Sequence, residues 1–182
     1  MSKDTALLVI DVQVALFEVP GNPTYQEQEL LTNIADLLTR ARSTHTPIIY
    51  IQHQEKDGPL VSGSRGWQIH PVIAPREHEP IVHKRAPDAF LSTMLEDELR
   101  TRGISHLVIT GCRTDFCVDT TSRSAISHGY DVTLVADGHS TINRVVLNAD
   151  QIVAHHNATL NGFGSDEHVI IVKPTSEIVF SA

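Results

Sequence analysis

The sequence has few cysteines and no long apolar run. Cys112 and Cys117 are the only two cysteines in 182 residues, too few for the disulfide framework of a small secreted protein. No apolar stretch approaches the roughly 18 to 20 residues that a membrane-spanning helix needs. The N-terminus enters a strand-like segment too early to leave room for a signal peptide. These absences predict a cytoplasmic protein with reduced thiols and no membrane partner.

Basic and aromatic residues are also scarce. The chain has 14 Lys and Arg against 22 Asp and Glu, a net charge of -8, and only 5% aromatic residues. Binding to nucleic acid requires clustered Lys and Arg that neutralise phosphates, so this charge balance argues against DNA or RNA as a partner. The remaining composition, 41% hydrophobic and 20% charged, is typical of a globular protein. A single domain over residues 1–182 is the expected organisation.

Six short apolar runs are spread along the chain, and each is typical of a strand buried in a parallel sheet. They lie at residues 5–10, 47–51, 80–82, 107–110, 132–135 and 169–172. Between them, apolar residues recur at the three- and four-residue steps of amphipathic helices. These segments are 30–41, 95–99, 118–126 and 146–160. The alternation predicts an α/β three-layer sandwich, in which a six-stranded parallel Rossmann-like sheet is flanked by helices.

One long irregular stretch, residues 54–79, is rich in Gly, Pro and His. A loop of that length inside a compact domain is usually functional, so we expect a lid or a wall of a site. Trp67, the only tryptophan, lies in this loop. It either walls the pocket or covers an apolar patch.

Three reactive side chains follow predicted strands. Asp11 ends the first strand, Lys84 follows the third, and Cys117 follows the fourth after a turn led by Gly111. Ligands of open parallel sheets bind beyond the carboxyl ends of the strands, so we expect these three side chains to share a site. They combine a carboxylate that accepts a proton, an ammonium that keeps it ionised, and a thiol nucleophile.

Cys117 stands where a helix should begin. The positive end of a helix and its unpaired backbone N–H groups favour a thiolate and can bind an oxyanion. Lys84 acts in the same direction, whereas an ionised Asp11 opposes it. We therefore expect a pKa for Cys117 below the free value of about 8.5, and a packed Cys112. The alternative is that Cys117 is a small buried hydrophobe.

Three stretches of the sequence resemble the signature blocks of the isochorismatase-like cysteine hydrolases. They are VIDVQ at 9–13, the segment 83–90 that begins His83-Lys84-Arg85, and TGCRTDFCVDTT at 110–121. Their order, spacing and strand context match, and the resemblance covers essentially the whole chain. It implies a six-stranded parallel sheet, a catalytic triad of Asp11, Lys84 and Cys117, and a homodimer or homotetramer.

The resemblance also implies a cis peptide bond between Cys112 and Arg113, with the backbone N–H groups of Arg113 and Cys117 as oxyanion donors. Arg113 stands where this family more often has a small residue. It either meets a substrate carboxylate or faces solvent and pairs with Asp115. The expected substrate contacts are Gln13, Leu16, Trp67, Arg113 and Phe116.

No metal or other cofactor is expected. The nicotinamidase branch of this family resembles a group of metalloenzymes, with a metal site formed by one Asp and two His near the second strand. This chain has YIQHQ at 50–54 in that place. His53 alone is insufficient, because a catalytic metal usually takes three protein ligands. The adjacent His155 and His156 point to different faces of a predicted helix, so we interpret them as packing or interface residues.

The resulting hypothesis is a hydrolase that cleaves the C–N bond of a small amide through a thioester on Cys117. A cysteine at this position favours amide chemistry, because the isochorismatase branch itself often lacks it. Two alternatives stay open. One is a vinyl-ether hydrolase of the isochorismatase type, in which Asp11 is a general acid. The other is a non-catalytic binding module with the same fold. The expected partner is a small-molecule amide.

Overall fold

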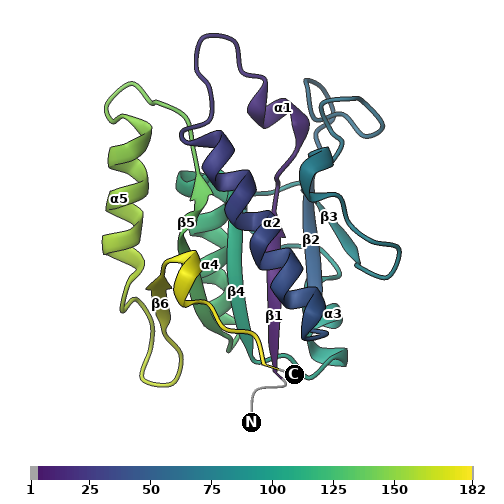
Figure 1. Cartoon of the computed structure of the whole chain (residues 1–182), viewed down its shortest axis with the longest axis vertical. Helices are drawn as coiled ribbons and strands as arrows, with labels where there is room; N and C mark the ends of the chain where they lie inside the picture. The colour runs from purple at the N-terminus through teal and green to yellow at the C-terminus, as the bar shows by residue number, and fades with distance from the viewer. Residues whose placement is uncertain (1–3, 182) are drawn as a thin grey trace.

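In the computed structural model, which describes residues 4–181, six strands form one parallel sheet (Figure 1). The strand order is β3-β2-β1-β4-β5-β6. The order reverses between β1 and β4, so the topological switch point lies beside β1. The strands are β1 (Thr5–Ile10), β2 (Ile48–His53), β3 (Ile81–Lys84), β4 (His106–Cys112), β5 (Asp131–Ser140) and β6 (Ile170–Lys173).

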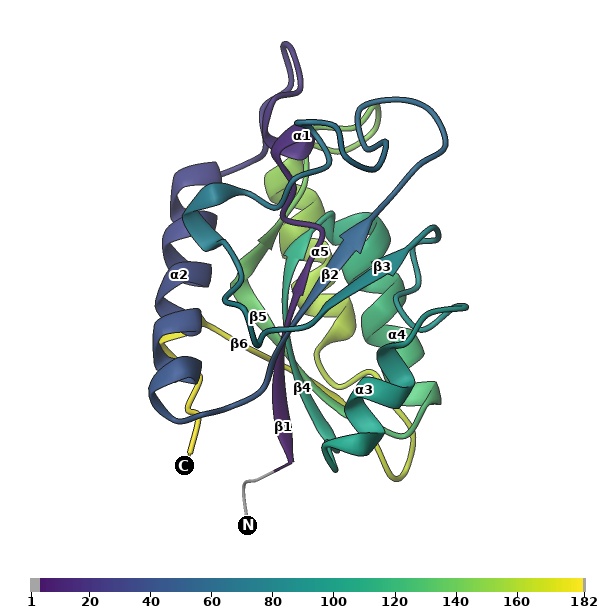
Figure 2. The same ribbon diagram turned by 90° about the vertical axis from the view of Figure 1, so that its right-hand side faces the viewer.

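Helices cover both faces of this sheet, which gives the three layers that the sequence predicts (Figure 2). α2 (Glu27–Ser43) packs on one face, and α3 (Leu95–Thr101), α4 (Asp119–Ser127) and α5 (Ala149–Leu160) pack on the other. α1 (Val14–Phe17) is a short helix just after β1. Two 3₁₀ turns, η1 (Pro71–Ile73) and η3 (Thr175–Glu177), complete the helical elements together with a turn before α4. No helix within residues 4–181 is long and apolar enough to cross a membrane.

The central strand β1 shows why the sheet forms. Leu7 and Val9 pack into the core beneath α2, whereas Ala6, Leu8 and Ile10 pack into the core on the opposite face. Successive strand residues point to opposite faces, so a continuous apolar run is buried on both sides only in the middle of a covered sheet. The apolar run therefore fixes β1 as an interior strand.

α5 begins later than the sequence pattern predicts. Asn148 and Gln151 form a capping box, and the first helical residue is Ala149. This cap satisfies backbone N–H groups at the helix start and stops the helix from extending backwards. Val146, which we expected to lie in the helix, is instead exposed in the preceding loop. The prediction of a helix from residue 146 is therefore wrong at its first turn.

The first part of the long stretch between β2 and β3 lies beyond the carboxyl ends of the strands (Figure 1), and its last residues return to the start of β3 at the opposite edge. Its residues 66–70 run beside the segment after β1. The backbone N–H groups of Val14 and Ala15 donate to the carbonyls of Gln68 and Gly66, and His70 N–H donates to the carbonyl of Val12. The stretch is therefore anchored beside the edge of the sheet where Asp11 lies.

Candidate active site

The three predicted catalytic side chains meet at the carboxyl edge of the sheet. Asp11 directly follows β1, Lys84 is the last residue of β3, and Cys117 lies in the turn after β4. The Nζ atom of Lys84 lies 2.7 Å from Oδ2 of Asp11 and donates to Sγ of Cys117 at 3.1 Å. Lys84 is thus in direct contact with both the carboxylate and the thiol.

Lys84 is surrounded by acceptors. Its Nζ also donates to the backbone carbonyl of Ala86 at 2.9 Å and lies 3.3 Å from Nδ1 of His53. Burial alone would lower the pKa of Lys84, but the charge of Asp11 and the interaction with Cys117 raise it above its ordinary value. Lys84 is therefore an ammonium ion at neutral pH.

His53 contacts Lys84, a role that the sequence does not indicate. The pKa of His53 is lowered, first by burial and then by the positive charge of Lys84. A neutral His53 can accept a hydrogen bond at Nδ1 from the Lys84 ammonium. His53 therefore helps to hold the position of the Lys84 side chain.

Asp11 has an unusual backbone and a carboxylate with few partners. Its φ of 49° lies in the left-handed region, which non-glycine residues rarely adopt. Neither carboxylate oxygen makes a well-aligned hydrogen bond with a described residue, and Oδ2 is in ion-pair contact with Lys84 at an angle outside hydrogen-bond geometry. Because buried polar atoms are nearly always bonded, a carboxylate with an unbonded Oδ1 that also acts on the Cys117 thiol is suited to accept a proton.

The environment of Cys117 overturns the expected direction of its pKa shift. The pKa of Cys117 is raised to about 12, first by burial and then by the negative charge of Asp11, and the charge of Lys84 only partly opposes them. This burial is not visible in the sequence: Cys117 packs against the core on the α3 and α4 side. The resting group is therefore a thiol, and its reaction needs a base.

Gly111 allows the turn that carries Cys117. A Cβ atom at Gly111 would lie 2.0 Å from the backbone oxygen of Ile10, so only glycine fits this close approach of β4 to β1. The next peptide bond, between Cys112 and Arg113, is cis, at the position that the family resemblance implies. A π-helical turn, η2 (Thr114–Val118), then leads into α4.

The two thiols lie in different environments. Cys112 is fully buried in the core beneath α2, whereas Cys117 packs against the core on the opposite face and contacts Lys84. Burial also raises the pKa of Cys112 to about 12. Cys112 is packed, as the sequence argument expects, and it has no disulfide partner among the described residues.

Arg113 adopts neither of the two arrangements that the sequence left open. Its guanidinium donates to the hydroxyl of Thr24 at 2.8 Å and to the backbone carbonyl of Leu16 at 2.5 Å. Only 7% of Arg113 is exposed, so it does not face solvent, and Asp115 pairs with Arg144 instead. The side chain of Arg113 fastens the segment after β1 to the turn after β4.

Gln13, which we expected to contact substrate, is fully buried and bonded to backbone groups. Its Nε2 donates to the carbonyls of His53 and Trp67 at 2.9 and 2.8 Å. Its Oε1 accepts from the His53 N–H at 2.9 Å. Gln13 therefore joins the ends of β1 and β2 to the long loop and has no donor left for a substrate.

The other expected contacts lie around the triad with different exposure. Leu16 is half-buried, and Phe116 is 49% exposed, with the Arg144 guanidinium 4.6 Å from its ring centroid. Trp67 is half-buried and stacks on His83 at 5.5 Å between ring centroids, and its Nε1 lacks a partner among the described residues. A loop residue therefore does reach β3, beside Lys84.

A cavity of about 460 Å³ opens beside Lys84. None of the five expected substrate contacts belongs to the described residues that bound it, and their contact with substrate stays a prediction. The cavity is bounded by Gln54, His83, Lys84, Arg85, Ala86, Leu91 and Ser92.

Two further residues that the sequence did not indicate support the turn that carries Cys117. Arg144 pairs with Asp115 at 2.8 Å. His139 is fully buried and bonds through Nδ1 to the Thr114 hydroxyl at 2.9 Å and through Nε2 to Oδ1 of Asn157 at 2.8 Å. His139 and Arg144 lie 25 and 29 residues from their partners in the turn, Thr114 and Asp115, and neither belongs to a local sequence pattern.

A metal centre was not expected, and the geometry offers few ligands for one. Among residues 4–181, no three His, Cys, Asp or Glu side chains lie close enough together to hold a metal ion. His155 and His156 meet edge to face at 5.4 Å between ring centroids, and Nδ1 of His156 bonds to the carbonyl of Ile152.

The chain is similar to known proteins over most of its length. An isochorismatase domain model matches residues 5–161. The isochorismatase family protein YddQ of Bacillus subtilis is 32% identical over 166 residues, which cover 87% of this chain and 92% of YddQ. A streptothricin hydrolase of Streptomyces noursei is 33% identical over 137 residues, which cover 75% of this chain but only 54% of that enzyme. A crystal structure of an isochorismatase family protein superposes with a TM-score of 0.86 at 32% identity, over 94% of this chain and 99% of the other. The chain belongs to the isochorismatase-like hydrolase family.

Proposed function

We propose that this hydrolase cleaves the C–N bond of a small amide through a thioester on Cys117. The observation that carries the proposal is the contact of Lys84 with both Asp11 and Cys117, at 2.7 and 3.1 Å. Cys117 has a raised pKa of about 12 and needs a base. The buried carboxylate of Asp11, paired with the Lys84 ammonium, is the base in reach.

The first half of the proposed cycle forms the thioester. The Asp11 carboxylate takes the proton of the Cys117 thiol while the sulfur attacks the amide carbonyl carbon, and the carbonyl electron pair moves onto oxygen. Backbone N–H groups of Arg113 and Cys117 stabilise the oxyanion. The oxyanion then re-forms the carbonyl, the C–N bond breaks, and the protonated Asp11 gives its proton to the leaving nitrogen.

The second half releases the acid. Water attacks the thioester carbonyl and gives a proton to the Asp11 carboxylate. Collapse of this second intermediate breaks the C–S bond, and the departing Cys117 sulfur takes the proton back from Asp11. Lys84 stays an ammonium ion throughout and stabilises the negative charge that passes between the carboxylate and the sulfur.

The direct test is release of ammonia or amine from a panel of small amides, ureides and carboxylated amides. Streptothricin belongs in the panel because one relative of this chain is a streptothricin hydrolase. For any amide that reacts, Cys117→Ser and Asp11→Asn should each lower kcat by about 10³-fold or more. Mass spectrometry after acid quenching should find the acyl group on Cys117.

The same panel separates the alternatives. If Cys117→Ser hydrolyses a vinyl ether as fast as the unsubstituted protein, whereas Asp11→Asn does not, the chain is an ether hydrolase with Asp11 as general acid. If every amide and ether stays intact and no acyl group is trapped on Cys117, the thioester mechanism is wrong and a binding role is favoured.

A further inference from the structure

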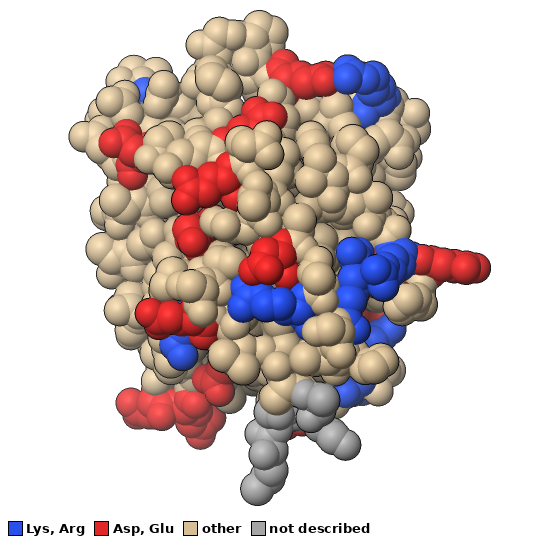
Figure 3. Space-filling view, in the orientation of Figure 1, with Lys and Arg blue, Asp and Glu red and all other residues tan. Residues whose placement is uncertain are grey.

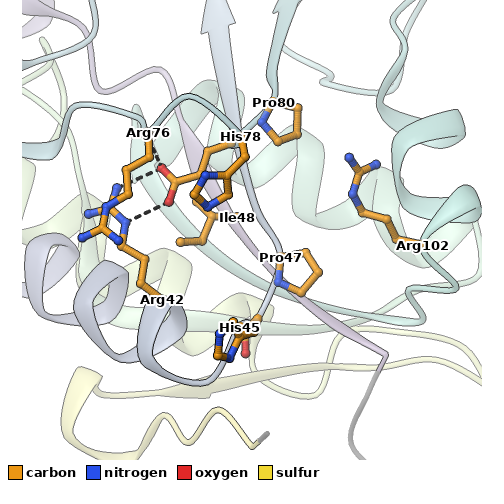
Figure 4. Close-up of a pocket in the computed structure, with 10 residues that line it drawn as sticks. Arg42, His45, Pro47, Ile48, Arg76, His78, Pro80 and Arg102 are labelled. Atoms are coloured by element: carbon orange, nitrogen blue, oxygen red, sulfur yellow. Dashed lines mark hydrogen bonds and ion pairs between the residues drawn. The ribbon is translucent and has the colours of Figure 1, made fainter.

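A second cavity lies at the edge of the sheet opposite to Asp11, Lys84 and Cys117 (Figure 4). It has a volume of about 400 Å³ and is bounded by the residues where β2 and β3 begin. Pro47, Ile48 and Pro80 form its apolar part, and three arginines face it. The amide mechanism makes no use of this cavity, so its function is a separate question.

The charge of this cavity differs from that of the whole chain. Arg42, Arg76 and Arg102 bound it, and Glu79 is the one carboxylate among its described lining residues. The chain as a whole carries a net charge of -8. In the orientation of Figure 1, most of the visible Lys and Arg side chains gather at the lower right of the molecule, whereas Asp and Glu side chains are spread widely (Figure 3).

Both carboxylate oxygens of Glu79 already accept hydrogen bonds from the protein. Arg42 donates to both carboxylate oxygens of Glu79 at 2.8 and 2.9 Å, and the backbone N–H of Arg76 donates to one of them at 2.8 Å. These contacts lower the pKa of Glu79 despite its burial. Glu79 therefore fixes Arg42 in place and leaves the Arg76 guanidinium without an ion-pair partner among the described residues.

Arg102, the residue directly after α3, faces the same cavity across from Arg42 and Arg76 (Figure 4). Its guanidinium pairs with Glu98, which does not line the cavity, and 36% of its side chain remains exposed. His45 and His78 add ring N–H donors. Counted with Glu79 and Glu98, the three arginines leave one net positive charge, with cationic donors on two opposite walls.

We propose that this cavity binds a small multivalent oxyanion of the phosphate or diphosphate class through Arg76 and Arg102. Guanidinium groups match the oxygen spacing of phosphate and donate in pairs. Two such groups on opposite walls select an anion with several charged oxygens over a monovalent one. The apolar residues between them give room for the body of a phosphorylated small molecule.

Calorimetric titration of the whole chain with pyrophosphate, at ionic strength held constant with sodium chloride, tests the proposal. We expect saturable binding of one pyrophosphate, weaker binding of inorganic phosphate, and no heat from chloride. The double substitution Arg76→Gln with Arg102→Gln should raise the Kd for pyrophosphate by tenfold or more. Glycerol phosphate in a parallel titration shows whether a phosphate ester is preferred to the free ion.

Arg100→Gln is the matched control. Arg100 is an exposed arginine of α3 that lies two residues from Arg102 and does not line the cavity, so its substitution removes the same charge outside the proposed site. It should change the Kd less than twofold. Circular dichroism shows whether each variant is folded. If the double variant does not fold, the single variant Arg76→Gln takes its place in the titration. Absence of pyrophosphate binding at millimolar concentration, unchanged binding by the variants, or an equal loss in Arg100→Gln would overturn the proposal.

Discussion

The ammonium of Lys84 lies 2.7 Å from the carboxylate of Asp11, and their side chains are only 0% and 2% exposed. Removing two charges from water costs several kcal/mol per ion, and their attraction offsets that only while the pair is intact. Oδ1 of Asp11 lacks a hydrogen-bond partner among the described residues. Such a pair is a weak contributor to stability, and its position beside Cys117 gives it a chemical use.

Lys84→Met should therefore damage stability and activity together. It leaves the Asp11 carboxylate buried and unpaired, so the free energy of unfolding should fall by about 3 to 5 kcal/mol. The double variant Lys84→Met with Asp11→Asn removes the stranded charge and should recover most of that loss, measured by urea denaturation. Amide hydrolysis should be lost in both variants. A double variant no more stable than Lys84→Met alone would show that the charges are not coupled.

Arg113→Met should weaken the fold without changing the preference for charged substrates. The substitution leaves the Thr24 hydroxyl and the Leu16 carbonyl unsatisfied, for a loss of about 1 to 3 kcal/mol in unfolding free energy. KM for acidic and neutral amides should change by similar factors, because the guanidinium is bonded to the protein. A selective rise in KM for acidic amides would instead assign Arg113 to a substrate carboxylate.

Activity should survive dialysis against a chelator such as EDTA. His53 contacts Lys84, and no cluster of three potential ligands exists in the part of the chain that the structure describes. A catalytic zinc usually needs three protein ligands. Hydrolysis rates before and after dialysis provide the measurement, and a lost rate that zinc, iron or manganese restores would contradict the prediction.

The sequence predicts the layers of this fold and the edge that carries the site, because both depend on local patterns. The run Thr5–Ile10 is apolar at nearly every position, which only an interior strand tolerates. The strand-end rule then brings Asp11 near Cys117. The partners of Arg113 could not be found in this way, because Thr24 lies 89 residues away and joins it through loop packing.

The raised pKa of Cys117 was also beyond sequence reasoning. The helix start and Lys84 are visible in the sequence, and both favour the thiolate. Burial favours the thiol, and its extent depends on how residues from several elements pack around the sulfur. Val146 shows the same limit in a helix. Its spacing fits the apolar pattern of α5, but the capping box of Asn148 and Gln151 makes the helix begin at Ala149.

His139 should make the protein lose stability on mild acidification. Burial lowers its pKa to about 4, whereas an unfolded histidine has a pKa of about 6.5. Between these values the unfolded state binds a proton that the folded state does not, so stability falls as pH decreases from about 6.5 to 4. The full effect is about 3 kcal/mol.

The measurement for His139 is urea denaturation at pH 7, 5.5 and 4.5. His139→Gln should be less stable at pH 7, because it loses the bonds to Thr114 and Asn157, but its stability should fall less steeply with acidification. His155→Gln is the control, since His155 is exposed, and it should keep the slope of the unsubstituted protein. Equal slopes in all three proteins would show that His139 does not carry this dependence.

Cys117 should react with iodoacetamide slowly at neutral pH and faster without levelling off above pH 8.5. Only the thiolate is alkylated, and a pKa of about 12 keeps its fraction small. In the range from pH 7 to 10 the rate should therefore rise by about tenfold per pH unit. Peptide mapping should find Cys117 labelled before the fully buried Cys112, with activity lost in proportion to the label on Cys117.

Two substitutions test the charges that set this pKa, and they should act in opposite directions. Asp11→Asn removes the negative charge that raises the pKa of Cys117, so labelling at a given pH should accelerate. Lys84→Met removes the positive charge that lowers it, so labelling should slow, provided that circular dichroism shows a folded protein at each pH. Ser124→Ala, on α4 but outside these contacts, should leave the rate unchanged. If Cys112 reacts first, or if fully labelled Cys117 leaves turnover intact, Cys117 is not the nucleophile.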